Sequence, residues 1–171
     1  MIKLFGCRIW NTTLKEFESR LLSGDYPPVF AKPATRAKRF TGCVFDSEYD
    51  LSQVYGVSRQ EQLFCSEVVT WLSEYRVYVV NSEIRSIDRY VGDATIKVDV
   101  AEIERAIEVL DKAGESLAGY GIDFGVLSNG VTALIEMNEG FALGAYSIDR
   151  KNYTDLIIKR WEEILSSPNM I

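Results

Sequence analysis

Apolar residues recur along this chain with two periods, which separate the segments expected to be helical from those expected to be strands. A capping-box pattern, Thr13-Leu14-Lys15-Glu16, opens the first apolar stripe of helical period, and Gly24 ends it. A similar pattern with Asp99 as the cap opens the second stripe, and the third runs over residues 152–165. The residues expected to face the core from these three helices are Leu14, Phe17, Leu21, Leu22, Ile103, Ile107, Leu110, Leu117, Leu156, Ile157, Trp161 and Ile164.

Shorter runs, either apolar or alternating with period 2, predict strands. Asn81-Ser82 is a turn that joins two of them, and Ser128-Asn129-Gly130 joins the last two, because Asn and Gly both tolerate positive φ. Residues 46–62 are mixed and polar, which predicts a short helix or turns. Hairpins and helices alternate in blocks, so we expect an α+β fold in one domain, residues 1–171, rather than a doubly wound parallel sheet. The expected strands are residues 29–32, 43–45, 63–69, 74–80, 84–90, 122–127 and 132–137.

Length and composition narrow the class of protein. The 171 residues are 47% hydrophobic and 26% charged, which suits one globular domain with a sizeable core. No apolar run approaches the roughly 20 residues that a membrane span needs. Residues 1–6 are too short for a signal peptide, and the widely spaced Cys7, Cys43 and Cys65 argue against a disulfide framework or a zinc ribbon. We therefore expect a cytoplasmic protein with reduced thiols and no membrane contact.

Charge and the absence of histidine restrict the chemistry further. The net charge of −6 disfavours a nucleic-acid partner, whereas the local basic cluster of Lys32, Arg36, Lys38 and Arg39 suits a small molecule that carries phosphate. Because the chain contains no histidine, Ser-His-Asp and Cys-His catalysis in their usual forms are excluded, as are histidine metal sites. Phosphoryl transfer is one reaction type that needs mainly positioning and charge neutralisation.

Three oxygen-bearing side chains are expected to meet on the last hairpin. Glu136 and Asn138 are two residues apart on one strand, so they point to the same face, and Asp123 on the neighbouring strand can reach that face. Two carboxylates and an amide oxygen form the hard ligand set that Mg²⁺ prefers when phosphates complete its shell. The alternative is a solvated hairpin face that carries ordinary acids, and spacing alone leaves both interpretations open.

Five short segments follow one another in an order that covers nearly the whole chain. They are Phe30-Ala31-Lys32-Pro33, Lys38-Arg39-Phe40-Thr41-Gly42, Cys65-Ser66-Glu67-Val68-Val69, Glu74-Tyr75-Arg76-Val77, and residues 120–125 followed by Glu136-Met137-Asn138 and Ala142-Leu143-Gly144-Ala145-Tyr146. Each segment alone is common, but the ordered set with its Glu-x-Asn ending is specific. On these residues the chain resembles the ATP-grasp superfamily, and most closely the bacterial and phage clade named for its two lysines.

The resemblance implies two α+β lobes with mainly antiparallel sheets, about residues 1–68 and 69–171, that clamp ATP. Lys32 would contact the α- and β-phosphates, and Lys38 would be the second lysine of the clade and a catalytic residue. The backbone of Glu67, Val68 and Val69 would pair with the adenine edge as the hinge of the two lobes. The alternatives are solvated surface lysines and an ordinary core strand.

The same resemblance implies that Arg76 faces phosphate or a substrate carboxylate as a binding and catalytic residue, with Arg89 as a weaker candidate for the same role. The alternative for Arg76 is a surface ion pair with Glu74. The residues in the places of the family's Mg²⁺ ligands are Asp123, Glu136 and Asn138.

The leading hypothesis is an ATP- and Mg²⁺-dependent carboxylate–amine ligase that acts through an acyl phosphate. Full-length relatives usually carry a further α/β domain before the nucleotide-binding lobes, whereas only about 28 residues precede Val29 here. The acceptor site is therefore expected to be reduced, open, or completed by a second chain, which includes a homodimer. The expected ligands are ATP with Mg²⁺ and a small carboxylate or peptide. Two alternatives stay open, a non-catalytic nucleotide-binding or interaction protein on the same fold and a small-molecule kinase.

Overall fold

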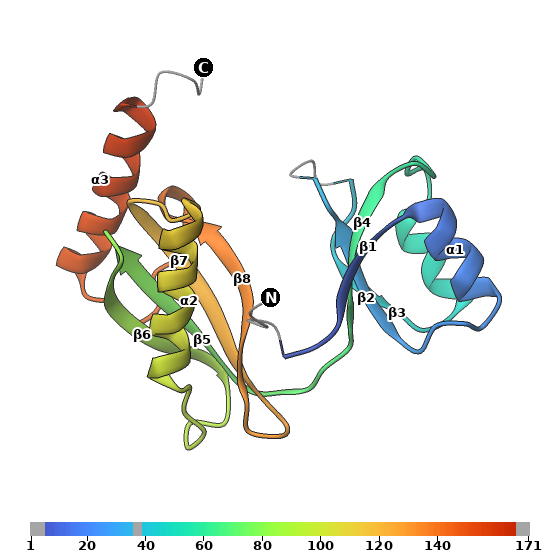
Figure 1. Ribbon diagram of the computed structural model, residues 1–171, viewed down its shortest axis with the longest axis horizontal. Coiled ribbons are helices and arrows are strands. Elements are labelled where there is room, and N and C mark those ends of the chain that lie inside the picture. Colours follow the sequence, from blue (N-terminus) through green and yellow to red (C-terminus); the bar gives the residue numbers. More distant parts are fainter. Residues whose placement is uncertain (1–5, 36–38, 167–171) are drawn as a thin grey trace. The chain divides into compact units, whose positions relative to one another are not determined.

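The computed structural model describes residues 6–35 and 39–166, which form two compact units (Figure 1). One unit comprises residues 7–69, and the other comprises Gly6 and residues 70–166. Within the described residues each unit contains a four-stranded sheet whose neighbouring strands are antiparallel, which confirms the α+β prediction. The predicted lobe limits and their assignment to one domain stay predictions. No helix in the described part of the chain has the length and apolar composition that crossing a membrane requires.

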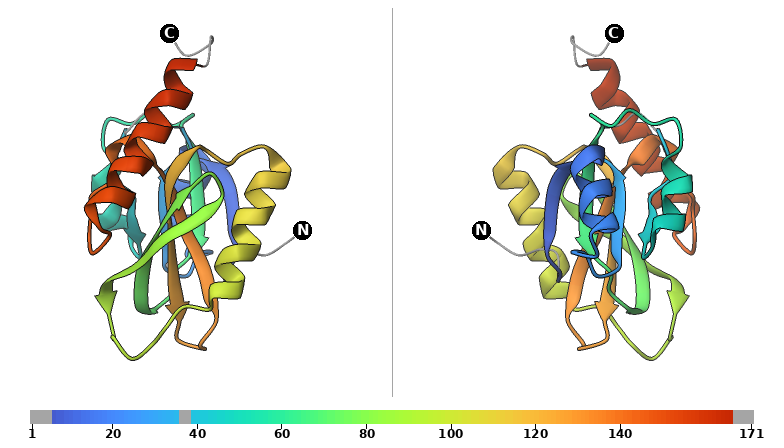
Figure 2. Two further views of the ribbon diagram at one scale, coloured as in Figure 1. Left: turned by 90° about the vertical axis from the view of Figure 1, so that its left-hand side faces the viewer. Right: turned by 90° about the vertical axis from the view of Figure 1, so that its right-hand side faces the viewer.

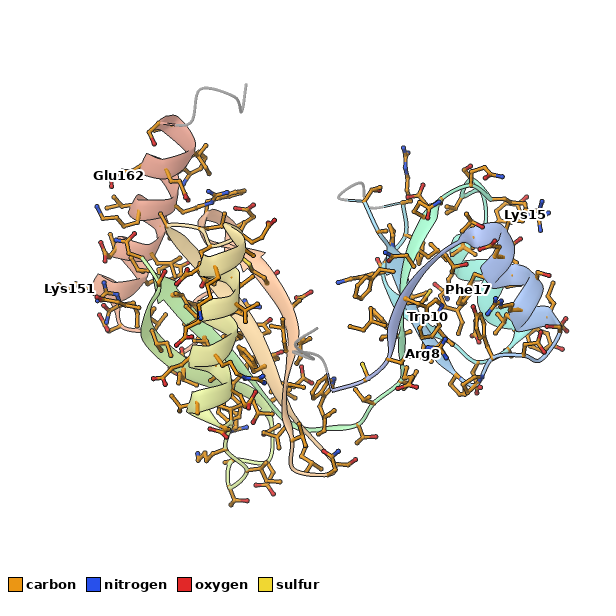
Figure 3. All side chains as sticks on the ribbon, in the orientation of Figure 1. Arg8, Trp10, Lys15, Phe17, Lys151 and Glu162 are labelled. Carbon is orange, nitrogen blue, oxygen red and sulfur yellow. The ribbon has the colours of Figure 1, made fainter. Side chains whose placement is uncertain are left out.

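The unit of residues 7–69 packs one helix against its sheet. The strands lie in the order β1 (Ile9–Thr13), β4 (Gln62–Glu67), β2 (Val29–Pro33) and β3 (Cys43–Phe45), and a 3₁₀ helix, Glu48–Val54, occupies the mixed polar segment. Helix α1 (Leu14–Leu22) begins after Thr13, whose hydroxyl accepts a hydrogen bond from the Glu16 N–H at 3.2 Å, as the capping pattern predicts. Phe17 faces the sheet from this helix and is fully buried (Figure 3). The predicted burial of Leu22 is wrong, because the last residue of the helix lies beyond the sheet contact and is 59% exposed.

The unit of residues 70–166 has a helix on each face of its sheet (Figure 2). The strands lie in the order β6 (Glu83–Gly92), β5 (Trp71–Val80), β7 (Gly119–Leu127) and β8 (Thr132–Glu139). Helix α2 (Val100–Ala113) packs on one face around Val77, Ile103 and Ile122. Helix α3 (Arg150–Ser166), which follows the 3₁₀ helix η2 (Gly140–Ala142), packs on the other face around Tyr78 and Leu156. Each face therefore has an apolar core of its own.

Helix α2 begins where the sequence predicts, but its cap differs in detail. The Asp99 carboxylate accepts a hydrogen bond from the Ala101 N–H at 2.9 Å. The Asp99 N–H donates to the Thr132 hydroxyl at 2.8 Å rather than to Glu102, so the second half of the capping-box pattern is not formed. A contact with β8 has thus replaced a contact within the helix.

Helix α3 turns a different face to the sheet than its apolar residues predict. Leu156 is fully buried, but Trp161 is 46% exposed, so its predicted burial is wrong. Arg160, one helical turn after Leu156, is only 5% exposed. Its Nε donates to the Glu139 carboxylate at 2.8 Å and its Nη1 to Glu163 at 2.7 Å. Two carboxylates satisfy the buried guanidinium, which apolar periodicity does not reveal. The other residues predicted to face the core from α2 and α3 are buried or half-buried.

The two predicted hairpin turns are present and differ in conformation. Asn81 and Ser82 both have positive φ, 48° and 63°, as in the two-residue turns that suit twisted strands. In the turn after β7 only Gly130 is left-handed, with φ 83°, and its N–H donates to the Leu127 carbonyl at 2.8 Å. The second turn is therefore a three-residue loop, in which Asn129 does not use the positive φ that the sequence allows.

Gly119 is expected to be essential for the packing of α3 on β7. A Cβ at this position would lie 2.3 Å from the Leu156 carbonyl oxygen, which belongs to the helix backbone and cannot move aside alone. We expect Gly119→Ala to lower the free energy of unfolding by about 1–3 kcal/mol in urea titrations. Gly144→Ala is the control, because nothing lies within 4 Å of a Cβ there. Equal transition midpoints for wild type and Gly119→Ala would contradict this account of the packing.

Candidate functional site

One face of the sheet in the unit of residues 70–166 gathers charged side chains around Asp123. On β7 alternate residues share a face, so Asp123 lies between Gly121 and Gly125. A Cβ at Gly121 would meet Leu143 at 2.7 Å, and one at Gly125 would meet the Trp71 ring at 2.3 Å. Side chains from other segments therefore lie over both glycines and shield Asp123, which is 2% exposed.

Arg76 on β5 is the cross-strand partner of Asp123. Its Nε and Nη2 donate to the two carboxylate oxygens of Asp123 at 2.8 and 2.6 Å. The two side chains are 13% and 3% exposed, so the ion pair is buried. Glu74, the alternative partner, accepts a hydrogen bond from the Tyr90 hydroxyl at 2.8 Å instead. Arg76 is thus held in one orientation by a bidentate bond.

Burial and charge act on this ion pair in opposite directions. Burial raises the pKa of Asp123, Arg76 opposes that rise, and the nearby Glu136 adds to it. The hydrogen bonds to Asp123 raise the pKa of Arg76. Arg76 is therefore the fixed positive charge of this surface, and the ionised form of Asp123 depends on it.

Glu136 and Asn138 of β8 complete the cluster around Asp123. Glu136 is the register partner of Asp123, and the Asn138 Nδ2 lies 3.4 Å from the Asp123 carboxylate and 3.2 Å from that of Glu136. The structure therefore brings together the three side chains predicted as metal ligands. No group of three His, Cys, Asp or Glu side chains among residues 6–35 and 39–166 is placed to hold a metal ion. A third ligand would be the Asn138 amide oxygen, and two carboxylates with a rotatable amide fit the ligand preference of Mg²⁺.

Aromatic rings cover the guanidinium of Arg76. The Tyr146 ring centroid lies 5.4 Å from the Arg76 Cζ, and Tyr90 stacks on Tyr146 with centroids 5.2 Å apart. A register shift between Glu74 and Tyr75 leaves Tyr90 without a partner on β5, so a β-bulge places this ring. Burial and the hydrogen bond to Glu74 raise the pKa of Tyr90, which stays a neutral donor. Sequence reasoning had predicted no role for either tyrosine.

Two buried polar groups hold the loop that carries Tyr146. The Tyr78 hydroxyl donates to the Gly144 carbonyl at 2.9 Å and accepts from the Tyr146 N–H at 3.0 Å. The Asp88 carboxylate accepts from the N–H groups of residues 147 and 148, both at 2.6 Å. The sequence did not predict these anchors, because Asp88 looks like a solvated position of an alternating strand and Tyr78 like a core residue. No local signal distinguishes them.

The unit of residues 7–69 carries the predicted phosphate-binding Lys32 on β2. Lys32 is half-buried, and its Nζ lies 5.4 Å from the ring centroid of Phe64. A Cβ at Gly42 would lie 2.9 Å from the Lys32 Cβ, so the stem of Lys32 packs closely against this loop. Lys32 is therefore not an ordinary solvated lysine. Lys38, the second predicted lysine, lies outside the described residues.

The remaining predicted residues lie at the end of β4 and on β6. The predicted strand ends at Glu67, whose carboxylate accepts a hydrogen bond from the Arg8 N–H at 2.9 Å, and Val68 and Val69 follow it outside the sheet. Arg89 pairs in register with Tyr75, one residue before Arg76, so it lies on the opposite face from the cluster. Its guanidinium donates to the Gly92 carbonyl at 2.7 Å. The structure does not bring Arg89 together with Arg76.

Comparison with known families agrees with the order of segments along the sequence. Residues 4–156 match the ATP-grasp domain described as family 2 of the clade that is named for its two lysines. The chain belongs to this ATP-grasp family. The resemblance identified from the sequence is thereby confirmed over most of the chain. No relative among curated protein sequences matches it.

Solved ATP-grasp structures share the fold at low sequence identity. The ligase PsnB, complexed with a phosphomimetic variant of its minimal precursor, Mg and ADP, is 17% identical, with a TM-score of 0.57 over 90% of this chain and 53% of PsnB. N5-carboxyaminoimidazole ribonucleotide synthetase in its ADP complex gives 12% and 0.60, over 90% and 46%. Macrocyclase MdnC from Microcystis aeruginosa MRC, bound with precursor peptide MdnA, gives 12% and 0.57, over 91% and 54%. This ATP-grasp chain spans about half the length of these proteins.

Removing Arg76 is expected to destabilise the protein strongly. Arg76→Met leaves Asp123 buried without a counter-charge, which typically costs about 3–5 kcal/mol in the free energy of unfolding. Arg105 is a matched control, because its pair with Glu102 is exposed, with side chains 45% and 38% accessible. Arg105→Met should cost less than about 1 kcal/mol. Denaturant unfolding at pH 7 measures both, and comparable losses would show that burial gives the Arg76 pair no special weight.

The pH dependence of Arg76→Met separates charge from packing. Without Arg76, burial raises the pKa of Asp123 unopposed, so the folded protein binds this proton more tightly than the unfolded chain does. Stability then falls as pH rises through the folded pKa. Arg76→Met should regain part of its lost stability between about pH 7 and about pH 5, whereas Arg76→Met/Asp123→Asn should not. A loss that is independent of pH would instead indicate lost packing of the arginine side chain.

Proposed function

We propose that this protein is an ATP- and Mg²⁺-dependent ligase that joins a carboxylate to an amine. Membership of the ATP-grasp family supports ATP-dependent ligation in general terms. The observation that carries the proposal is the cluster of Asp123, Glu136 and Asn138 beside the buried guanidinium of Arg76. It combines cation ligands with a fixed positive charge, and phosphoryl transfer depends on such preorganised charges.

The proposed reaction has two steps. An oxygen of the substrate carboxylate attacks the γ-phosphorus of ATP, the bond from that phosphorus to the bridging oxygen breaks, and an acyl phosphate and ADP form. The amine then attacks the acyl carbon, inorganic phosphate leaves, and the nitrogen loses a proton as the amide forms. Neither step needs a histidine, which this chain lacks.

Arg76 is proposed to bind a phosphate or carboxylate oxygen with the donors that Asp123 leaves free. A guanidinium has five N–H donors, and Asp123 accepts from two of them, which leaves three. Because the bidentate bond fixes the plane of the guanidinium, those donors are already oriented before substrate arrives. Mg²⁺ held by Asp123, Glu136 and Asn138 would neutralise the negative charge of the phosphates.

Lys32 and the backbone of residues 67–69 are proposed to bind the nucleotide. Packing of Lys32 against Gly42 and Phe64 restricts its directions, which suits a lysine that must meet the α- and β-phosphates. Lys38 is proposed as the second lysine of the site and a catalytic residue. Arg89 is left out of the proposal, because it lies on the other face of its sheet from Arg76.

A peptide carboxylate is the proposed acceptor of the phosphoryl group. The support is that two of the similar structures, PsnB and MdnC, contain precursor peptides. The chain spans about half of each, so residues beyond the matched region are proposed to come from a partner chain or a second copy. This part of the proposal concerns the substrate and not the nucleotide.

Product analysis tests the reaction directly. The protein with ATP and Mg²⁺ should release ADP when amino acids or short peptides are added, and mass spectrometry should find a product equal to two substrates less one water. A phosphorylated product without an amide would instead identify a kinase, and ATP binding without ADP would identify a binding protein.

Glu136→Gln is expected to abolish turnover without disturbing the fold. Glu136 is exposed, so the melting temperature without nucleotide should change little. Loss of one negative cation ligand should lower the rate of ADP release on the order of 10²-fold or more. Glu108→Gln removes an equally exposed carboxylate on α2 and should keep full activity. A Glu136→Gln protein that releases ADP at the wild-type rate would rule out a role for Glu136 in binding the cation.

Lys32→Ala is expected to weaken ATP binding more than Lys15→Ala does. Lys15 is an exposed lysine on α1, whereas Lys32 is half-buried and directed by its neighbours. Loss of one charge-assisted contact to phosphate should raise the dissociation constant about tenfold or more. Calorimetry with ATP and Mg²⁺ measures the difference. Equal affinities for wild type and Lys32→Ala would show that Lys32 does not contact the nucleotide.

A further inference from the structure

A second cationic group, built from other residues than the ATP-grasp cluster, starts from Arg85 on β6. The register of β6 against β5 shifts at this point, so Arg85 has no partner residue while the residues on either side of it do. Such a β-bulge turns a side chain away from the regular alternation of the strand. The Arg85 Nη2 consequently lies 4.0 Å from the carboxylate of Asp155 on helix α3.

Arg85 and the first turns of α3 line a cavity of about 560 Å³, within the range of roughly 300–1,000 Å³ that small-molecule sites occupy. The charged and hydroxyl-bearing residues that line it are Arg85, Arg150, Lys151, Thr154 and Asp155. Three cations and one carboxylate leave a surplus of two positive charges, although the whole chain carries −6. In Figure 3, Lys151 lies at the start of α3, at the cavity, and Glu162 lies far along the helix from it.

The cations of this cavity lack partners within the protein. The Arg85 Nε is buried and has no hydrogen-bond partner among the described residues. Its Nη2 lies 3.1 Å from the Glu83 carboxylate, which is 70% exposed and therefore screened by solvent. Within the described ranges, neither Arg150 nor Lys151 takes part in an ion pair. The protein therefore leaves donors and positive charge available at one concave surface.

Helix formation does not account for the position of these cations. The positive end of the helix dipole lies at the start of α3, where cationic side chains are disfavoured. The helix N–H groups of Lys151 and Asn152 are already bonded to the Asp149 carboxylate, both at 3.0 Å. The available binding groups are thus the side chains of Arg85, Arg150 and Lys151 rather than the helix terminus.

We propose that this cavity binds the dianionic phosphate group of a small molecule. Two negative charges match the surplus of two positive charges, and the flat guanidinium of Arg85 can present Nε and an Nη to two phosphate oxygens. Arg150 and Lys151 supply further charge, and the Thr154 hydroxyl can donate a hydrogen bond. The proposal needs neither ATP nor Mg²⁺, so it stands or fails independently of the ligase function.

NMR titration of the isotope-labelled protein without ATP tests the site. Inorganic phosphate and ribose 5-phosphate are added separately at constant ionic strength, and the amide signals of residues 150–155 and the Arg85 Hε are followed. We expect saturable shifts confined to these signals. Arg85→Lys keeps the charge but loses the planar pair of donors, so it should weaken binding about tenfold. Lys151→Gln, which changes an exposed side chain, should weaken it several-fold.

Lys159→Gln is the matched control, because Lys159 lies on the same helix outside the cavity and pairs with Glu162 at 2.8 Å. Its affinity should equal that of the wild type. Tighter binding of ribose 5-phosphate would identify a phosphomonoester as the ligand, and equal binding would identify free phosphate. Shifts that do not saturate, or that are unchanged in both Arg85→Lys and Lys151→Gln, would overturn the proposal.

Discussion

The buried ion pair between Arg76 and Asp123 is the interaction on which the rest of this surface depends. A carboxylate that is 3% exposed needs a partner to stay charged, and the neighbouring strand supplies one with two hydrogen bonds. Because the pair bridges β5 and β7, it is tied to their register. A slip of one residue would move both side chains to the opposite face, into the apolar core around Val77 and Ile122. The register that builds the core therefore also builds the charged cluster.

The orientation of Arg76 is set from two directions. Asp123 fixes the plane of the guanidinium through its two oxygens, and the ring of Tyr146 lies over it. Tyr146 in turn belongs to a loop whose backbone is bonded to the side chains of Tyr78 and Asp88. All these groups project from one face of the same sheet or pack on it, so a flexible loop residue becomes part of a rigid surface. Preorganisation of this kind lowers the cost of binding a charged ligand.

The sequence predicted those features that depend on local periodicity and capping, and it missed those that depend on register shifts. Asp99 was recognised as a cap, and the period of two placed Asp123, Glu136 and Asn138 together, because both rules act over a few residues. Tyr90 and Arg85 were missed, since each is the extra residue of a bulge that depends on how two strands pair. Arg160 was missed because carboxylates elsewhere in the fold allow a cation to replace Trp161 in the buried face.

The Arg76–Asp123 bond also determines how a divalent cation can join the cluster. Each carboxylate oxygen of Asp123 has two lone pairs and accepts one bond from Arg76, so the carboxylate can contact a cation without releasing the guanidinium. Asp123 and Glu136 carry two negative charges and Arg76 one positive charge, which leaves the cluster with one negative charge. A divalent cation reverses this to one positive charge. On the proposed function, a triphosphate is therefore repelled by the cluster alone and attracted once the cation is present, so the cation is expected to arrive before the nucleotide or together with it.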